Sequence, residues 1–335
     1  MKTAFLLRGS QCFGDLLMIS WTPKQIKEKL GYEHLTVATW KRNQCIWDNN
    51  PYIDEFLILD DIKETNLADQ LDKWQKEYTK FFDFRYSIEL KYLRNSSDNV
   101  LTIEQRKELT QGRNYYEHAL EDYDLSGTKA ELYFSESEQN TIKIIQGAKQ
   151  NKRICWQITG TGRNKLLVFL PAYIHEIMKK YPDVEHYLVG DQKTDIGIHN
   201  DKLIDMRSKW TPRETIVFAN TFDLIVAPES FMIHVAGALD IPNICFYSHS
   251  APENLTKHFK NSFAVVPECA CSPCYLILKD FRQYTNLRER KKAREQEQWC
   301  LLREKKDHFR GIGFRCTVQI DHKKVIEKIS EIIEV

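Results

Sequence analysis

The first segment of the sequence that could do chemistry is the turn formed by Gly14 and Asp15. It follows the apolar run Thr3–Leu7, which is typical of a buried strand, and it precedes a helical pattern. Glycine permits close backbone approach, and a carboxylate at a helix N-terminus could take a proton from a bound hydroxyl group. The alternative is that Asp15 only stabilises the first turn of its helix.

A second segment combines glycines with hydroxyl groups and cations, and it follows the apolar run Arg153–Gln157. Its sequence is Thr159-Gly160-Thr161-Gly162-Arg163-Asn164-Lys165. The hydroxyls of Thr159 and Thr161 and the glycine amides could hold a diphosphate, and Arg163 and Lys165 could supply the positive charge. The segment lacks the pattern of a Walker loop. A solvated glycine turn with ordinary surface cations is the alternative.

The third segment follows the apolar run Leu224–Ala227 and begins a short helix. Ser230 is a natural N-cap, so its hydroxyl and the neighbouring amides could bind phosphate, while Glu229 could hold a ribose hydroxyl. His234 lies one turn into an apolar helix, where a structural histidine is the favoured interpretation. An ordinary βαβ unit that binds nothing is the alternative for the whole segment.

The fourth segment is a group of cysteines near the C-terminus. Cys271 and Cys274 form a C-x-x-C pair, and Cys300 and Cys316 could complete a tetrahedral zinc site. Free or packed thiols are the alternative. A bound zinc ion would stabilise the tail and would take no part in a reaction.

Composition and charge limit the functions open to the chain. The sequence has 335 residues, of which 42% are hydrophobic and 28% charged, and a net charge of +1. This balance gives no global electrostatic case for binding nucleic acid or membrane. The sequence contains no apolar run of the roughly 20 residues that a membrane helix needs. Nine cysteines without a signal peptide pattern indicate a cytoplasmic protein. The charged stretch Arg282–Arg310 is typical of a solvated helix, with contact to a polyanion as the alternative.

Strand and helix patterns alternate along most of the sequence, which favours an α/β protein with parallel sheets. We expect a helix over residues 15–30, ended by Gly31, and further helices over 62–79, 136–149 and 166–181. A less regular region, residues 91–129, separates two series of strands and helices. The sequence therefore predicts two doubly wound, Rossmann-like domains facing a cleft, residues 1–150 and 151–335.

Together these motifs resemble glycosyltransferase family 9, the heptosyltransferase-like family with the GT-B fold. The motifs that carry the resemblance occur in the family's order and extend through most of the chain. They are Ala4–Arg8 with Phe13–Asp15, Asn50–Glu55, Phe222–Val226, Met232–Leu239, Ser250–Glu253 and Cys271–Tyr275.

The resemblance implies an inverting, metal-independent transfer of a sugar from a nucleotide-diphosphate donor, with an ADP-sugar favoured, to a hydroxyl of a glycan acceptor such as a lipopolysaccharide or other polysaccharide. Asp15 is then the general base. Residues that would bind the donor are Gly14, Thr159, Thr161, Arg163, Lys165, Glu229, Ser230, Phe231, Met232 and His234. The N-terminal domain would bind the acceptor and the C-terminal domain the donor, with the C-terminal tail packing back on the N-terminal domain.

Two features of the sequence motivate two alternatives to this function. The chain has Glu229-Ser230-Phe231 where the family usually has Asp-Thr-Gly, which places a ring where backbone often approaches phosphate. A non-catalytic protein that binds a nucleotide or glycan is therefore one alternative. The other keeps the fold and glycosylates hydroxymethylated bases in DNA, for which the charged stretch Arg282–Arg310 is the motive.

Overall fold

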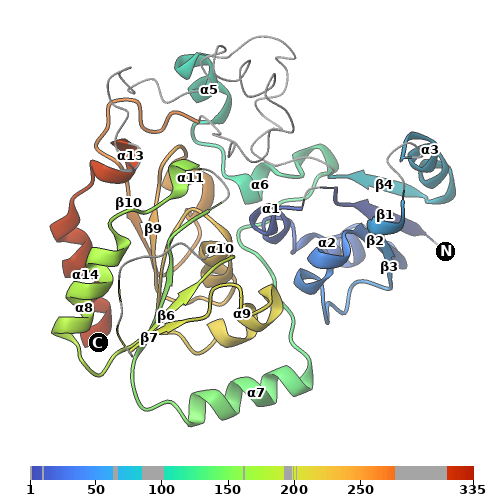
Figure 1. Cartoon of the computed structure of the whole chain (residues 1–335). Helices are drawn as coiled ribbons and strands as arrows, with labels where there is room; N and C mark the ends of the chain where they lie inside the picture. The colour runs from blue at the N-terminus through green and yellow to red at the C-terminus, as the bar shows by residue number, and fades with distance from the viewer. Residues whose placement is uncertain are drawn as a thin grey trace. The chain divides into compact units, whose positions relative to one another are not determined.

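A computed structural model shows two compact α/β units, each built on a parallel sheet (Figure 1). The first unit comprises residues 1–92 and 115–140, and the second comprises residues 93–114 and 141–335. Residues 93–114 thus group with the second unit although they precede residue 150. The structure describes residues 2–9, 11–62, 67–84, 102–160, 163–191, 198, 200, 202–275 and 315–335. The predicted α/β class with two parallel sheets is confirmed.

The sheet of the first unit has four parallel strands in the order β3-β2-β1-β4. The strands are β1 (Thr3–Leu7), β2 (His34–Thr39), β3 (Glu55–Ile58) and β4 (Lys80–Asp83). Its α-helices are α1 (Phe13–Leu17), α2 (Thr22–Glu28), α3 (Leu67–Glu77) and α6 (Tyr115–His118). Its 3₁₀-helices are η1 (Lys41–Ile46), η2 (Leu59–Asp61) and η4 (Glu121–Tyr123).

The expected single helix over residues 15–30 is wrong, because the chain forms α1 and α2 with a break between them. The hydroxyls of Ser20 and Thr22 donate to the carbonyls of Leu17 and Ile19. Such local bonds compete with the helix, and Pro23 has no backbone N–H to continue it. Gly31, at a φ of 70°, follows the end of α2.

Aromatic side chains form the core on one face of the first sheet. The ring of Phe5, which is fully buried, lies 4.8 Å from that of Trp74 in α3 and 5.4 Å from that of Phe81 in β4. Because Phe5 lies on the central strand β1, the packing of its ring fixes this strand. It therefore also fixes the position of the residues that follow β1.

The sheet of the second unit has six parallel strands in the order β10-β9-β8-β5-β6-β7. The strands are β5 (Arg153–Gln157), β6 (Glu185–Val189), β7 (Leu203–Asp205), β8 (Leu224–Pro228), β9 (Asn243–Phe246) and β10 (Ser262–Val265). Its helices include α8 (Leu170–Lys180), α9 (Pro212–Ala219), α10 (Phe231–Ala238), α11 (Pro252–Leu255), α13 (Arg315–Val318), α14 (His322–Glu334) and the 3₁₀-helix η5 (Arg163–Lys165).

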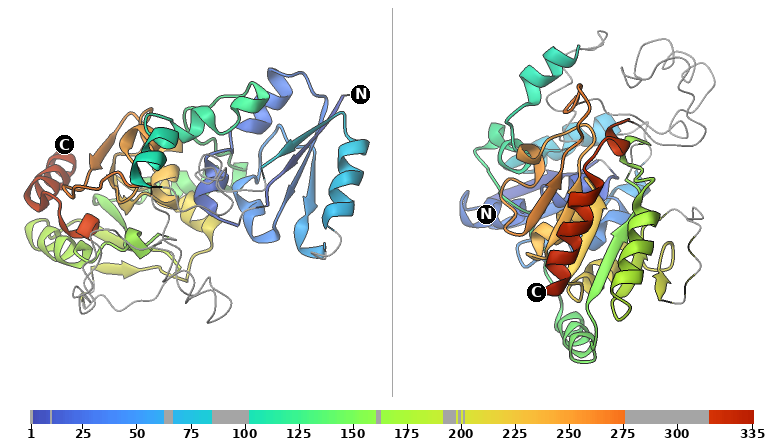
Figure 2. Two further views of the ribbon diagram at one scale, coloured as in Figure 1. Left: turned by 90° about the horizontal axis from the view of Figure 1, so that it is seen from above. Right: turned by 90° about the vertical axis from the view of Figure 1, so that its left-hand side faces the viewer.

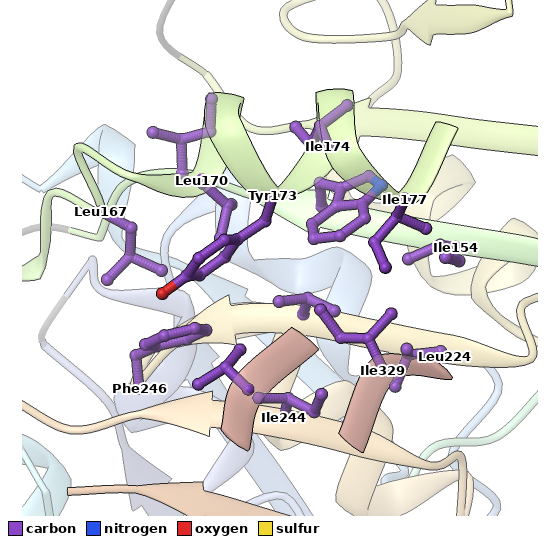
Figure 3. Packing of buried hydrophobic residues seen from close by; sticks show 14 of the residues in the cluster. Ile154, Leu167, Leu170, Tyr173, Ile174, Ile177, Leu224, Ile244, Phe246 and Ile329 are labelled. Atoms are coloured by element: carbon purple, nitrogen blue, oxygen red, sulfur yellow. The ribbon is translucent and has the colours of Figure 1, made fainter. Parts of the chain in front are cut away.

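The C-terminal helix α14 packs beside α8 on the second sheet (Figure 2). Ile329 of α14 and Tyr173 of α8 belong to the same buried cluster as Ile244 and Phe246 of β9 (Figure 3). At the helix surface, Lys180 donates to the hydroxyl of Ser330 at 3.0 Å. The C-terminal helix is thus part of the core of the second unit, and the expected packing of the tail on the N-terminal domain stays a prediction.

A segment from the irregular middle of the sequence belongs to the second unit. It contains α5 (Ile103–Thr110), which begins with a capping box formed by Thr102 and Gln105. The amide of Asn254 donates to the carbonyls of Thr110 and Arg113 at 3.0 and 2.8 Å, and Arg106 Nε donates to the carbonyl of Cys274 at 2.8 Å. Several hydrogen bonds thus attach α5 to the loops beyond the second sheet.

Helix α7 (Glu136–Gly147) contrasts with the helices of both cores because none of its residues is buried. Ile144 is 71% exposed, and the division between the two units falls within this helix. Among all the residues described, no helix is both long enough and apolar enough to span a membrane.

Candidate functional site

The second sheet has a topological switch point between β5 and β8. From β5 the chain continues to β6 and β7 on one side, and then builds β8, β9 and β10 on the other. Trp156 pairs with Val226 in this parallel register, so the loops after β5 and β8 emerge next to each other. In doubly wound sheets, ligands bind in the crevice at such a point. The two segments expected to bind a donor therefore lie together.

Lys165 provides a direct link between these two loops. Its Nζ donates to the carbonyl of Glu229 at 2.9 Å, and its side chain is partly buried. A Cβ atom at Gly160 would lie 2.9 Å from Lys165 Cδ and 3.0 Å from its Cβ. Glycine is therefore needed at position 160, because a larger residue would displace the stem of the lysine.

The rest of the glycine segment is described in part. The carbonyl of Thr159 accepts a hydrogen bond from Gln157 Nε2 at 2.8 Å, and the Thr159 residue is partly exposed. Arg163 begins η5, but its side chain lies outside the described residues, as do Thr161 and Gly162. Their expected contacts with a diphosphate stay predictions.

Helix α10 begins at the switch point with Ser230 as its N-cap. The Ser230 hydroxyl does not cap the helix, because it donates to Gln157 Oε1 at 2.8 Å and lies 3.0 Å from the carbonyl of Pro228. Gln157 Oε1 instead accepts from the backbone amide of Met232 at 3.3 Å. A side chain from β5 therefore supplies the cap that the sequence assigned to Ser230.

Glu229 is enclosed by the loop after β9. Its carboxylate accepts from the Ser248 hydroxyl at 2.7 Å and from the Ser250 hydroxyl, and it lies 2.6 Å from His249 Nδ1. Burial alone raises the pKa of this carboxyl, but His249, Lys165 and the hydrogen bonds outweigh burial and hold the pKa well below its ordinary value. The carboxylate is thus a buried, ionised group that binds the loop after β9. Only 1% of the residue is exposed.

The other predicted residues of α10 differ in exposure. Met232 and His234 are buried within the helix, as expected for a structural histidine. Phe231 is partly exposed at the first turn. Of this segment, Phe231 and Ser230 are the side chains that keep some access to solvent.

The first unit has a corresponding switch point, between β1 and β4. Asp15 lies in the first turn of α1, mostly buried, and its Oδ2 is 3.0 Å from Nη2 of Arg8. Arg8 is itself fully buried, and its Nη1 donates to the carbonyl of Phe84 at 2.7 Å. Burial lowers the pKa of Arg8, which the nearby Asp15 opposes. Gly14 precedes Asp15 in α1.

Sequence reasoning missed the parts played by Arg8 and Gln157. Each follows or ends the apolar run of a central strand, and each joins that strand to a loop beyond a neighbouring strand. Both could have been recognised in the sequence as polar residues at the carboxyl end of a buried strand. The loop that lines the crevice begins at this end of the strand.

The described cysteines do not by themselves form the predicted zinc site. Sγ of Cys269 and Sγ of Cys271 are 4.0 Å apart, and Cys274 hydrogen-bonds Cys271. Within the described ranges, no three His, Cys, Asp or Glu residues form a group that could hold a metal ion, and Cys300 lies outside those ranges. The charged stretch Arg282–Arg310 also lies outside them. The four-cysteine site therefore stays a prediction.

Comparison of the sequence with protein families and with curated proteins finds no match. Comparison of the fold finds glycosyltransferases. The chain is similar to a glycosyl transferase family 9 protein from Veillonella parvula, with a TM-score of 0.63 and 12% identity over 98% of this chain and 97% of that chain. It is also similar to E. coli ADP-heptose lps heptosyltransferase II, with a TM-score of 0.55 and 15% identity over 79% and 90% of the two chains.

A third similar structure was solved with a ligand. The dodecameric iron-containing heptosyltransferase TibC of enterotoxigenic E. coli, in complex with ADP-D-beta-D-heptose, has a TM-score of 0.61 and 14% identity over 99% of this chain and 77% of that chain. These likenesses confirm the predicted resemblance at the level of the fold, which is the GT-B fold.

Proposed function

We propose that this protein is a glycosyltransferase that moves a sugar from a nucleotide-diphosphate donor to a hydroxyl of a glycan acceptor. We propose further that transfer inverts the anomeric centre, needs no metal, and uses an ADP-sugar such as an ADP-heptose. The fold is shared with heptosyltransferases, one of which was solved with ADP-D-beta-D-heptose.

The observation that carries the proposal is the arrangement around Lys165. The Lys165 ammonium lies at the switch point, 2.9 Å from the carbonyl of Glu229 and next to the N-terminus of α10. A cation and a helix N-terminus together favour a phosphate group. Glu229 is turned inward and its charge is compensated by His249 and Lys165, so its carboxylate adds little negative charge where the diphosphate would bind.

In the proposed reaction, Asp15 takes the proton from the acceptor hydroxyl. The acceptor oxygen forms a bond to the anomeric carbon while the bond from that carbon to the diphosphate oxygen breaks. The diphosphate leaves with the electron pair, and attack on the opposite face inverts the centre. Lys165 and the dipole of α10 stabilise the negative charge that develops on the leaving group. Arg8 fixes the orientation of the Asp15 carboxylate through their 3.0 Å contact.

Isothermal titration of the whole protein with ADP, UDP and GDP, and with adenosine as a control, tests the donor site. We expect ADP to bind and adenosine to bind more weakly, because only ADP carries the diphosphate. Absence of binding by all three diphosphates would overturn the proposal.

Transfer is tested with ADP-heptose and a heptose-free lipopolysaccharide core, in the presence and absence of EDTA. We expect ADP release that depends on the acceptor and is unchanged by EDTA. Binding without transfer or hydrolysis would support instead the non-catalytic alternative, for which the replacement Glu229-Ser230-Phe231 is the motive. A gel shift at low salt with hydroxymethylated DNA tests the acceptor alternative, and absence of a shift removes it.

A further inference from the structure

The side chain of Gln157 joins the two loops at the switch point of the second unit. Gln157 is the last residue of β5 and is 8% exposed. Its Nε2 donates to the carbonyl of Thr159 in the loop after β5. Its Oε1 accepts from the Ser230 hydroxyl and from the Met232 amide, both beyond β8. One carboxamide therefore contacts both segments that the proposed function assigns to the donor.

The orientation of this carboxamide follows from its partners. A backbone carbonyl such as that of Thr159 can only accept a hydrogen bond, and the backbone amide of Met232 can only donate one. Nε2 must therefore face Thr159, and Oε1 must face the start of α10. The side chain is held at both ends, so it fixes the spacing between the two loops.

The contact with α10 bears on how this helix meets an anion. The Met232 amide is one of the first N–H groups of the helix, which have no partner within the helix. Gln157 Oε1 satisfies it with a neutral oxygen at 3.3 Å. A carboxylate at this position would place a negative charge at the helix end where the diphosphate is proposed to bind. A neutral acceptor caps the helix and leaves its positive end available.

We propose that Gln157 is a positioning residue that holds the loops after β5 and β8 in register for the diphosphate of the donor. The inference rests on the proposed function, since it concerns the same site. Gln157 acts through Thr159, Ser230 and the Met232 amide and needs no contact with the ligand itself.

The test is the variant Gln157→Glu, which has the same shape. It keeps an acceptor for Ser230 and Met232, loses the donor to Thr159, and adds one negative charge. We expect ADP affinity to fall at least about tenfold, because like charges a few ångströms apart repel, while adenosine affinity stays unchanged. If Gln157 only stabilised the fold, the variant would change the affinities for ADP and adenosine together, or would change neither of them.

The matched control is Gln146→Glu on α7. Gln146 Nε2 also donates to a backbone carbonyl, that of Asn220, and the residue is exposed. This variant loses the same kind of hydrogen bond and gains the same charge outside both loops, so we expect ADP affinity to match the wild type.

A second variant, Gln157→Leu, removes all three hydrogen bonds without adding charge. We expect weaker ADP binding and unchanged adenosine binding, with the fold checked by circular dichroism. If the wild type binds ADP and Gln157→Leu binds it equally well, the inference about Gln157 is wrong while the proposed function stands. If the wild type binds none of the three nucleoside diphosphates, the proposed function fails and the inference falls with it.

Discussion

The central strands of the two sheets are followed by side chains of different charge. After β1, the fully buried Arg8 forms an ion pair with Asp15 and donates to Phe84 beyond β4. At the end of β5, the neutral Gln157 reaches the loop beyond β8, and the cation of that site is supplied by Lys165. Both units thus use one side chain to connect the loops of a switch point. The first unit has a charge pair at its switch point. The second caps α10 with a neutral oxygen, so no carboxylate from β5 offsets the positive end of that helix or the nearby Lys165 cation.

The largest expected effect comes from Asp15→Asn. Loss of the base should lower transfer about 10²–10⁴-fold while ADP binding is unchanged, as measured by product formation and by titration. The variant also removes the carboxylate that pairs with the buried Arg8, and breaking a buried ion pair in this way costs about 3–5 kcal/mol of stability.

A double variant separates these two effects. Arg8→Met with Asp15→Asn removes both charges, so thermal unfolding should recover toward the wild type while transfer stays low. Wild-type transfer by a folded Asp15→Asn protein would show that Asp15 is not the base.

Lowering the pH tests the uncharged histidine that is buried next to β5. His186 of β6 accepts from Trp156 Nε1 at 3.0 Å, and its Nε2 has no hydrogen-bond partner among the described residues. Burial, with a smaller effect of Lys202, lowers the pKa of His186 to about 4. The unfolded chain binds this proton near pH 6.5, so stability is lost as the pH falls from about 6.5 to 4, by about 3 kcal/mol in total.

The control for the acid prediction is His186→Asn, whose amide cannot titrate but can accept from Trp156. Urea unfolding at pH 7 and pH 4.5 should show a smaller pH dependence in the variant than in the wild type. An equal pH dependence in both proteins would contradict the assignment to His186.

Lys165→Met should weaken ADP binding about 10–100-fold, because it removes a charge-assisted contact with phosphate. Lys165→Arg keeps the charge and should bind with intermediate affinity. Lys202→Met is a matched control, since Lys202 Nζ also donates to a backbone carbonyl, that of Pro182, and its loss should leave ADP affinity unchanged. If Lys165→Met binds ADP as the wild type does, the cation of the second site has been assigned wrongly.

The smallest effect is expected from Ser230→Ala. Because Gln157 and not Ser230 accepts from the start of α10, loss of the hydroxyl should lower ADP affinity less than about tenfold, as one ordinary hydrogen bond would. Titration of Ser230→Ala beside Gln157→Leu makes the comparison, and a larger loss in Ser230→Ala would reverse the order of importance.

The central strands β1 and β5 could be predicted from the sequence because their apolar runs are almost wholly buried. β1 and β5 begin and end at the residues expected. The break between α1 and α2 was not predicted, because it depends on side-chain bonds of Ser20 and Thr22 that a helical pattern does not reveal.

The site could be predicted in its loops but not in the contacts between them. Asp15, Lys165 and Ser230 are recognisable by type and local spacing. Arg8 meets Phe84, 76 residues away, and Gln157 meets Ser230, 73 residues away, so these contacts depend on strand order. The inward turn of Glu229 depends likewise on the loop after β9, because its ionised carboxylate is stable only where Ser248, His249 and Ser250 surround it.

The exposure of helix α7 has a consequence for limited proteolysis of the chain. The chain passes between the units at residues 92–93, 114–115 and 140–141, and the last passage lies in α7, where a protease meets no buried side chain. A single nick there would leave residues 102–114 attached to the second unit through Asn254 and Arg106. The two fragments should therefore elute together from a sizing column and separate only in denaturant, so that a nicked protein stays one particle.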